Sequence, residues 1–87
     1  MYLHLGQNTA VRQSSVIAVF DMDNTTVSKK SREFLEIAER HGQIKTVSDE
    51  LPKSYVVCEN SGEITVYISP VSSSTLLKRT NLTELVD

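Results

Sequence analysis

Two strand-forming runs joined by a tight turn are the feature that most constrains how this chain folds. Ser54–Glu59 and Glu63–Ser69 are rich in valine, isoleucine and tyrosine, and Asn60-Ser61-Gly62 lies between them. Such residues favour strands, and a short Asn/Ser/Gly loop accepts the backbone angles that a tight hairpin requires. The sequence therefore predicts an antiparallel hairpin, against which the other elements must pack.

Further strands are predicted in the first half of the chain. Tyr2–Leu5 and Thr9–Arg12 flank Gly6-Gln7-Asn8, which predicts a second hairpin at the N-terminus. Val16–Phe20 is apolar at every position, so we expect a central strand that is covered on both faces. Ile44–Val47 is a candidate for one more short strand.

A main helix is predicted between these strands. Thr25, Thr26 or Ser28 caps its start, and it runs to about His41. Gly42 is expected just past its end in the left-handed conformation. An apolar stripe is expected to face the core, and it consists of Phe34, Leu35, Ile37 and Ala38.

A short second helix is predicted over Ser72–Arg79, with the first or second serine of this segment as its cap. Leu76 and Leu77 are expected to face inward from it. The tail over residues 80–87 is expected to be a frayed extension of the same helix.

These elements predict an α+β fold, namely a small antiparallel sheet of about five short strands with one main helix and a short C-terminal helix. With 87 residues, the range 1–87 is expected to form a single domain. A domain of this size buries only about 60–65% of its unfolded surface, and self-association is a common way to add stability. A homo-oligomer is therefore expected.

The charge balance argues against one class of function. Nine Lys and Arg residues stand against eleven Asp and Glu residues, which gives a net charge of −2. A dedicated nucleic-acid-binding domain is usually basic as a whole, so strong generic binding is disfavoured. The net charge does not exclude a local basic patch, because opposite charges can be segregated in space.

The single cysteine, Cys58, excludes an internal disulfide and a cysteine-based zinc site, which needs several ligands. Within the apolar run Tyr55–Cys58 it is interpreted as a small buried hydrophobe rather than a reactive thiol. No apolar stretch reaches the ~20 residues of a membrane span, and the N-terminus lacks a basic leader region. We therefore expect a cytoplasmic protein with no membrane partner, no metal and no cofactor.

The segment Val16–Thr26 ends an apolar run in Asp-x-Asp-x-Thr, which resembles the nucleophile motif of haloacid dehalogenase-like phosphohydrolases. By that resemblance Asp21 would attack phosphorus, Asp23 would act as acid and base, and Mg²⁺ would bridge carboxylate and phosphate. Such enzymes also need further acidic ligands and a full parallel α/β sheet, for which too few residues follow Thr26. The motif is interpreted as the end of a strand before a helix, and no catalytic residue is predicted.

Cations gather at the predicted start of the main helix, where Lys29, Lys30 and Arg32 oppose the helix dipole. One interpretation is an anion site that combines these side chains with free backbone N–H groups. The other is a solvated face on which the cations pair with Glu33 and Glu36.

The remaining cations are more scattered. Lys78 and Arg79 end the last predicted helix, where the dipole favours positive charge. Arg12 and Lys53 are isolated. If folding brings them to one face with Lys78 and Arg79, a basic patch exists, but the sequence alone does not show this. If the protein binds DNA, phosphate contacts are expected from Lys29, Lys30, Arg32, Lys53, Lys78 and Arg79.

Two segments carry a resemblance to a known family. Met1–Gly6 and Ile68–Arg79, the latter containing Ser-Pro-x-Ser-Ser-Ser-Thr-Leu, resemble the extracellular matrix regulatory protein B family, or RemB. The order between them also fits, with Phe20-Asp21 ending a strand, a helix around Glu33–Leu35, and Pro52-Lys53-Ser54 leading into the hairpin. The resemblance covers nearly the whole chain and implies a regulatory, non-enzymatic role with self-association.

RemB is paralogous to RemA, a family of bacterial transcription activators of biofilm matrix genes that form ring-like oligomers and bind DNA. Thr75 and Arg79 fit the RemA spacing, but the basic run that RemA carries before its hairpin corresponds here to the acidic Ser48–Lys53. Acidic residues that face a phosphate backbone reduce affinity. The resemblance thus implies an oligomeric regulator of matrix genes that contacts DNA, or an adaptor that works through a protein paralogue. A minimal phosphohydrolase is the third hypothesis.

Overall fold

The computed structural model describes residues 1–22 and 29–80. Six strands, one short 3-10 helix and two α-helices lie in this part of the chain. In chain order they are β1 (Tyr2–Gly6), β2 (Thr9–Arg12), η1 (Gln13–Ser15), β3 (Val16–Asp21), α1 (Lys29–Arg40), β4 (Ile44–Thr46), β5 (Ser54–Asn60), β6 (Glu63–Ser69) and α2 (Ser73–Arg79).

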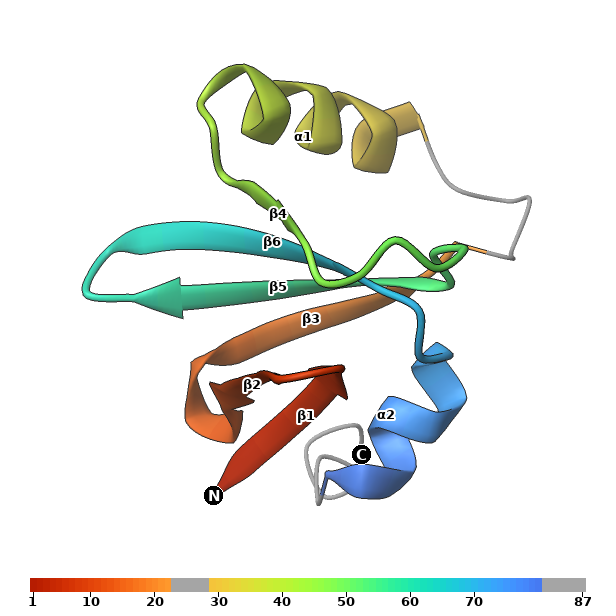
Figure 1. The fold of residues 1–87 in the computed structure, drawn as a ribbon. Coiled ribbons are helices and arrows are strands. Elements are labelled where there is room, and N and C mark those ends of the chain that lie inside the picture. Colours follow the sequence, from red (N-terminus) through yellow and green to blue (C-terminus); the bar gives the residue numbers. More distant parts are fainter. Residues whose placement is uncertain (23–28, 81–87) are drawn as a thin grey trace.

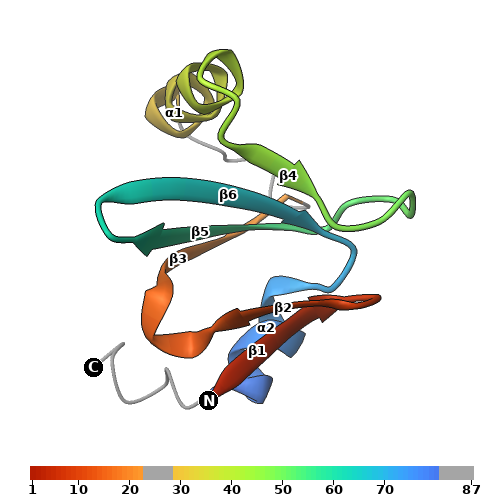
Figure 2. The same cartoon turned by 60° about the vertical axis from the view of Figure 1, so that its left-hand side comes forward.

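The elements form three layers. A four-stranded sheet of β3, β5, β6 and β4, in that order, lies in the middle. Helix α1 covers one face of this sheet, while the β1–β2 hairpin and α2 lie against the other face (Figures 1 and 2). The expected α+β class is therefore confirmed. Neither of the two described helices is long and apolar enough to span a bilayer.

The β5–β6 hairpin is formed as predicted. Its strands pair antiparallel from Ser54 opposite Ser69 to Asn60 opposite Glu63. The loop between them consists of Ser61 and Gly62, with φ angles of 52° and 83°. Positive φ at both loop residues matches the right-handed twist of the two strands, and this geometry is why a Ser-Gly pair suits the turn.

The position of β3 differs from the prediction. It lies at an edge of the sheet and pairs only with β5 among the described strands, so the expected central strand is wrong. Ile17 is 59% exposed and Phe20 is 39% exposed. The pairing register shifts between Val16 and Ala18, which takes Ile17 out of the regular ladder.

The sheet is mixed rather than purely antiparallel. Strand β4 pairs parallel with β6, through Ile44 opposite Val66 and Thr46 opposite Ile68. Helix α1 connects β3 to β4 across the sheet, and such a helical crossover returns the chain in the same direction. Because β3 and β6 both run antiparallel to β5, a strand β4 that runs in the direction of β3 is also parallel to β6. This pairing depends on the crossover and not on a local turn, so turn signals in the sequence did not reveal it.

The β1–β2 hairpin forms a separate two-stranded sheet. Burial alternates along β1, where Leu3 and Leu5 are buried while Tyr2 and His4 are exposed. The inward residues join one core of the protein, which we call the hairpin-side core. It consists of Leu3, Leu5, Val11, Val56, Cys58 and Leu76.

Helix α1 packs on the opposite face of the sheet through a smaller helix-side core of Ala38, Val57 and Val66. Only half of the predicted apolar stripe packs against the sheet, because Phe34 remains 38% exposed and Ile37 51% exposed. The predicted caps Thr25, Thr26 and Ser28 lie outside the described residues.

The end of α1 follows the prediction. Gly42 has a φ of +66°, its N–H donates to the Glu39 carbonyl at 3.1 Å, and the Gln43 N–H donates to the Ala38 carbonyl at 2.9 Å. These two bonds are the Schellman pattern that satisfies the last carbonyls of a helix.

Helix α2 is capped by Ser72, whose hydroxyl accepts a hydrogen bond from the Thr75 N–H at 3.2 Å. Leu76 is fully buried and Leu77 is half-buried. The helix ends at Arg79, because Thr80 is already extended with φ −108° and ψ 160°. The rest of the predicted helical tail, residues 81–87, lies outside the described part.

Candidate nucleic-acid interface

Acidic residues are absent from two long stretches of the sequence. All eleven Asp and Glu residues fall within 21–63 and 84–87, so residues 1–20 and 64–83 contain none. The fold brings parts of these two stretches together, since Leu3 and Leu5 of β1, Val11 of β2 and Leu76 of α2 share the hairpin-side core. We call β1, β2 and α2 the acid-free layer. Despite the net charge of −2, this layer therefore contains basic residues and no acidic residue.

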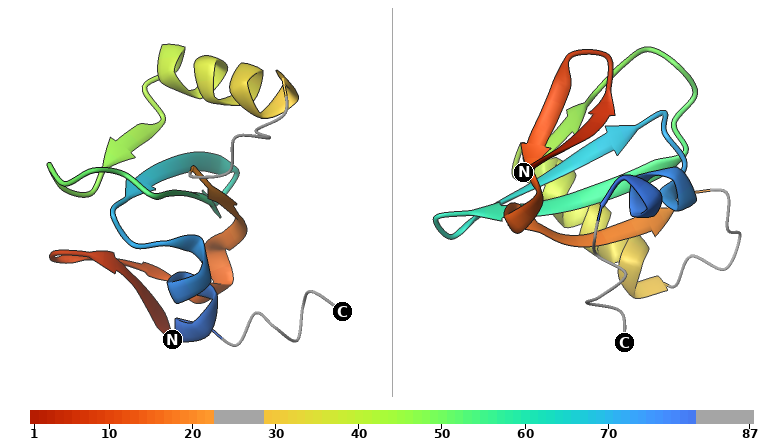
Figure 3. Two further views of the ribbon diagram at one scale, coloured as in Figure 1. Left: turned by 90° about the vertical axis from the view of Figure 1, so that its right-hand side faces the viewer. Right: turned by 90° about the horizontal axis from the view of Figure 1, so that it is seen from below.

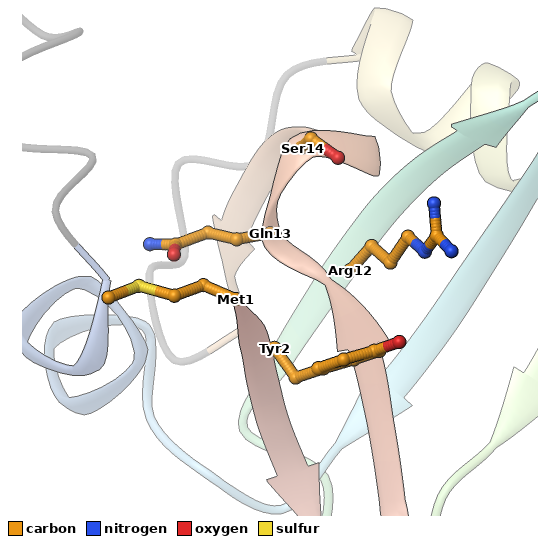
Figure 4. A pocket seen from close by; sticks show the side chains of 5 residues that line it. All are labelled: Met1, Tyr2, Arg12, Gln13 and Ser14. Atoms are coloured by element: carbon orange, nitrogen blue, oxygen red, sulfur yellow. The ribbon is translucent and has the colours of Figure 1, made fainter.

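Three exposed cations lie in the acid-free layer, namely Arg12, Lys78 and Arg79. Arg12 pairs across the hairpin with Tyr2, and the two side chains project to the same side (Figure 4). Tyr2 is 63% exposed. Opposite residues of an antiparallel pair have Cβ atoms about 4.5–5.5 Å apart, so a guanidinium and an aromatic ring are presented together.

A shallow pocket of about 500 Å³ lies at this end of the hairpin, lined by Met1, Tyr2, Arg12, Gln13 and Ser14 (Figure 4). The Gln13 N–H donates to the Met1 carbonyl at 3.0 Å and holds the two chain segments of the pocket together. An aromatic ring beside a guanidinium suits the phosphate and base of a nucleic acid, because the ring stacks and the cation pairs with the anion.

Helix α2 adds its two cations beside β1. The Arg79 Nη1 donates to the His4 carbonyl at 3.2 Å. His4 lies two residues after Tyr2 on the same exposed face of β1, which corresponds to about 7 Å along a strand. Lys78 and Arg79 are in the last turn of α2, where the helix dipole also favours positive charge.

The other predicted DNA-contacting cations lie elsewhere. Arg32 is exposed on α1, and α1 and α2 lie on opposite faces of the sheet (Figure 3). Lys53 is exposed just before β5, where its N–H donates to the Ser69 carbonyl at 2.8 Å and its carbonyl accepts from the Met22 N–H at 2.9 Å. The side chains of Lys29 and Lys30 lie outside the described part.

Two of the six predicted cations, Lys78 and Arg79, therefore belong to the acid-free layer, together with Arg12. Sequence reasoning treated Arg12 as isolated. A signal for its role was present in the sequence, namely the absence of any acid before Asp21, because a strand pair built from such a segment cannot neutralise its own cation.

Cys58 is a core residue, as expected. Its side chain is fully buried in the hairpin-side core. Burial raises the pKa of the thiol, and a hydrogen bond with Ser15 opposes this effect more weakly. The thiol is consequently poorly suited to nucleophilic chemistry, which requires the thiolate.

Comparison with known proteins adds an independent line of evidence. No family model matches the chain. The sequence is 37% identical over 79 residues to extracellular matrix regulatory protein B of Bacillus subtilis (strain 168), a match that covers 91% of this chain and 89% of that protein. The chain belongs to the extracellular matrix regulatory protein B family.

Proposed function

We propose that this protein regulates the expression of extracellular matrix genes in the cytoplasm, as a self-associating protein that contacts duplex DNA through the acid-free layer. The name of the Bacillus subtilis relative supports a regulatory role in matrix production. The observation that carries the DNA contact is that β1, β2 and α2 contain cations and no acidic residue.

The expected contacts follow from the electrostatics of DNA. Each phosphate neutralised by a cation steepens the dependence of log affinity on log salt concentration by about 0.9. Arg12, Lys78 and Arg79 would thus contribute a slope of roughly 3 for one chain. Such a slope is too small for tight binding by a single copy, and self-association would multiply it.

The α1 side of the protein is less suited to this role. Glu33, Glu36 and Glu39 are all exposed on the helix that carries Arg32. Arg32 and Glu36 are four residues apart, so they are neighbours on the helix surface. Carboxylates close to a phosphate backbone oppose binding, and for this reason we assign the DNA contact to the acid-free layer.

An adaptor role without DNA is the second candidate. The exposed apolar side chains of β3 and α1, described above, favour protein contacts. In this version the chain would act through hetero-oligomers with a more basic paralogue. It differs from the first proposal because the isolated protein would have no affinity for DNA.

We also propose a non-enzymatic role. Asp21 ends β3, which pairs antiparallel with β5, whereas the phosphohydrolase motif requires a parallel sheet. Asp23 lies outside the described residues. If the protein hydrolysed a phosphomonoester and Asp21→Asn removed that activity, this part of the proposal would be wrong.

The test of the proposed function combines two measurements on the full chain. Fluorescence anisotropy with a labelled duplex, at low ionic strength and across a salt series, measures DNA binding, while light scattering measures mass. We expect binding that weakens steeply with salt. No affinity at low ionic strength rejects direct DNA contact, and a mass increase on addition of a basic paralogue would then support the adaptor version.

A further inference from the structure

The two edges of the four-stranded sheet are protected very differently. Strand β4 has three residues and carries Lys45, and a short edge with a lysine discourages pairing with another chain. Strand β3 has six residues, and its charged residue is Asp21 at the very end. Apart from the irregularity at Ile17, β3 lacks the features that normally prevent an edge strand from pairing with another chain.

The backbone of β3 is oriented for a further strand. The Met22 N–H donates to the Lys53 carbonyl at 2.9 Å, so Met22 faces β5. Backbone groups alternate in direction along a strand, and Phe20 therefore also faces β5 while Val19 points away from it. The N–H and carbonyl of Val19 are thus directed towards the open side of the sheet.

Apolar side chains accompany this edge. Ile17 and Phe20 are 59% and 39% exposed. Phe20 pairs with Tyr55, which packs against the helix-side core, so Phe20 lies on the α1 face of the sheet.

Helix α1 leaves apolar side chains exposed on this same face. Phe34 and Ile37, exposed to 38% and 51%, are three residues apart and share one flank of α1. Together with Ile17 and Phe20 they expose on the order of 400 Å² of side-chain surface, given the size of such residues. This is about half of the ~800 Å² that each partner contributes to a standard interface.

We propose that β3 pairs antiparallel with β3 of a second copy, which joins two four-stranded sheets into one and buries Ile17, Phe20 and the Phe34–Ile37 flank at the junction. A second copy fits because this surface is self-complementary under a two-fold axis. An antiparallel pair places the two Asp21 carboxylates at opposite ends of the junction, whereas a parallel pair would set them side by side.

This inference rests on the self-association in the proposed function and deepens it. A two-fold axis perpendicular to the sheet leaves both acid-free layers on the same side of the joined sheet. Arg12, Lys78 and Arg79 of both copies would then lie on one side of the joined sheet. Pairing through β3 would in this way double the number of cations available to one stretch of DNA.

The test uses Ile17→Lys, which places a charge on the proposed junction. Leu51→Lys is the matched control, since Leu51 is 80% exposed and lies in the loop between β4 and β5 rather than on β3 or α1. Light scattering should give the wild type and Leu51→Lys a mass of at least twice the 9.7 kDa chain. Ile17→Lys should give a smaller assembly, with an unchanged far-UV circular dichroism spectrum. Phe20→Lys is the second variant if Ile17→Lys does not fold.

Two results would overturn the inference, namely a wild type with the mass of one chain, or wild-type assembly retained by a folded Ile17→Lys or Phe20→Lys. Because mass is measured without DNA, a failure of the β3 junction can be distinguished from a failure of DNA binding. Assembly that persists in the variants together with DNA binding would reject the β3 junction alone. Assembly through β3 without any DNA affinity would reject the DNA contact alone.

Discussion

The Ser69 hydroxyl donates a hydrogen bond to the Leu5 carbonyl at 2.5 Å, which ties the end of β6 to the N-terminal hairpin. The same hydroxyl accepts a hydrogen bond from the Val71 N–H at 3.0 Å. Nearby, the Ser54 hydroxyl donates to the Val71 carbonyl at 2.7 Å. Ser69 and Ser54 are both fully buried. Their hydrogen bonds connect the four-stranded sheet to the N-terminal hairpin and to Val71, which precedes α2.

Ser69→Ala should destabilise the protein considerably. The substitution leaves the buried Leu5 carbonyl and the Val71 N–H without this partner, and such a loss costs about 1–3 kcal/mol. Urea unfolding followed by circular dichroism measures it. Ser14→Ala, at an exposed serine, is the control and should change stability by less than about 0.5 kcal/mol. Equal stability of the two variants would contradict a stabilising role for the hydrogen bonds of Ser69.

Gly6→Ala should also be destabilising, for a conformational reason. Gly6 has a φ of +128°, and an added Cβ would lie 3.2 Å from the Pro70 Cγ. Backbone strain of this kind costs on the order of 1–3 kcal/mol, to which the contact with the proline ring adds. Gly42→Ala is a matched comparison, because its φ is +66° and a Cβ there meets nothing within 4 Å. Its cost should be about 1 kcal/mol, and a larger loss for Gly42→Ala than for Gly6→Ala would be inconsistent with the close approach.

The thiol of Cys58 should be protected in the folded protein. Burial raises its pKa above the ordinary value of 9.0, so the folded state disfavours the thiolate. The unfolded chain therefore loses the thiol proton first as pH rises, and stability is retained below that ordinary value and falls above it. Cys58→Ala should reduce this fall between about pH 8 and pH 10, measured by urea unfolding. A native Cys58 that reacts with a thiol reagent as fast as the unfolded chain would contradict burial.

Local signals in the sequence were sufficient for the hairpins, the start of α2 and the end of α1. Ser61-Gly62 determined the β5–β6 turn, Ser72 capped α2, and Gly42 ended α1, because each of these features depends on residues close in sequence. Fold class followed from the same elements. The order of the strands did not, since it depends on which surfaces pack after the local elements form.

The position of β3 shows where the reasoning failed. A continuous apolar run is typical of a strand covered on both faces, but Ile17 and Phe20 remain exposed at an edge. If the protein self-associates as proposed, a second copy would cover these side chains, which a small domain cannot cover by itself. The same argument applies to Phe34 and Ile37 of α1.

The candidate interface was only partly predictable. In the sequence, each cation could be judged only by its neighbours in the chain, and the densest cluster lies at the start of α1. The fold places Arg12, Lys78 and Arg79 in one layer on the same side of the four-stranded sheet, although they are far apart in sequence. The Arg79 contact with the His4 carbonyl spans 75 residues. The proposed interface rests on where acidic residues are absent from the sequence, and a search for dense cations does not detect that signal.

The most direct measurement compares two double variants in the salt dependence of DNA binding. Arg12→Gln with Lys78→Gln removes two cations from the acid-free layer, and Arg32→Gln with Lys53→Gln removes two from elsewhere, so both change the net charge of −2 equally. The first variant should lower the slope of log affinity against log salt by about 1.8 for each chain, and the second should leave it nearly unchanged. Equal slopes for the two variants would contradict the assignment of DNA contact to β1, β2 and α2.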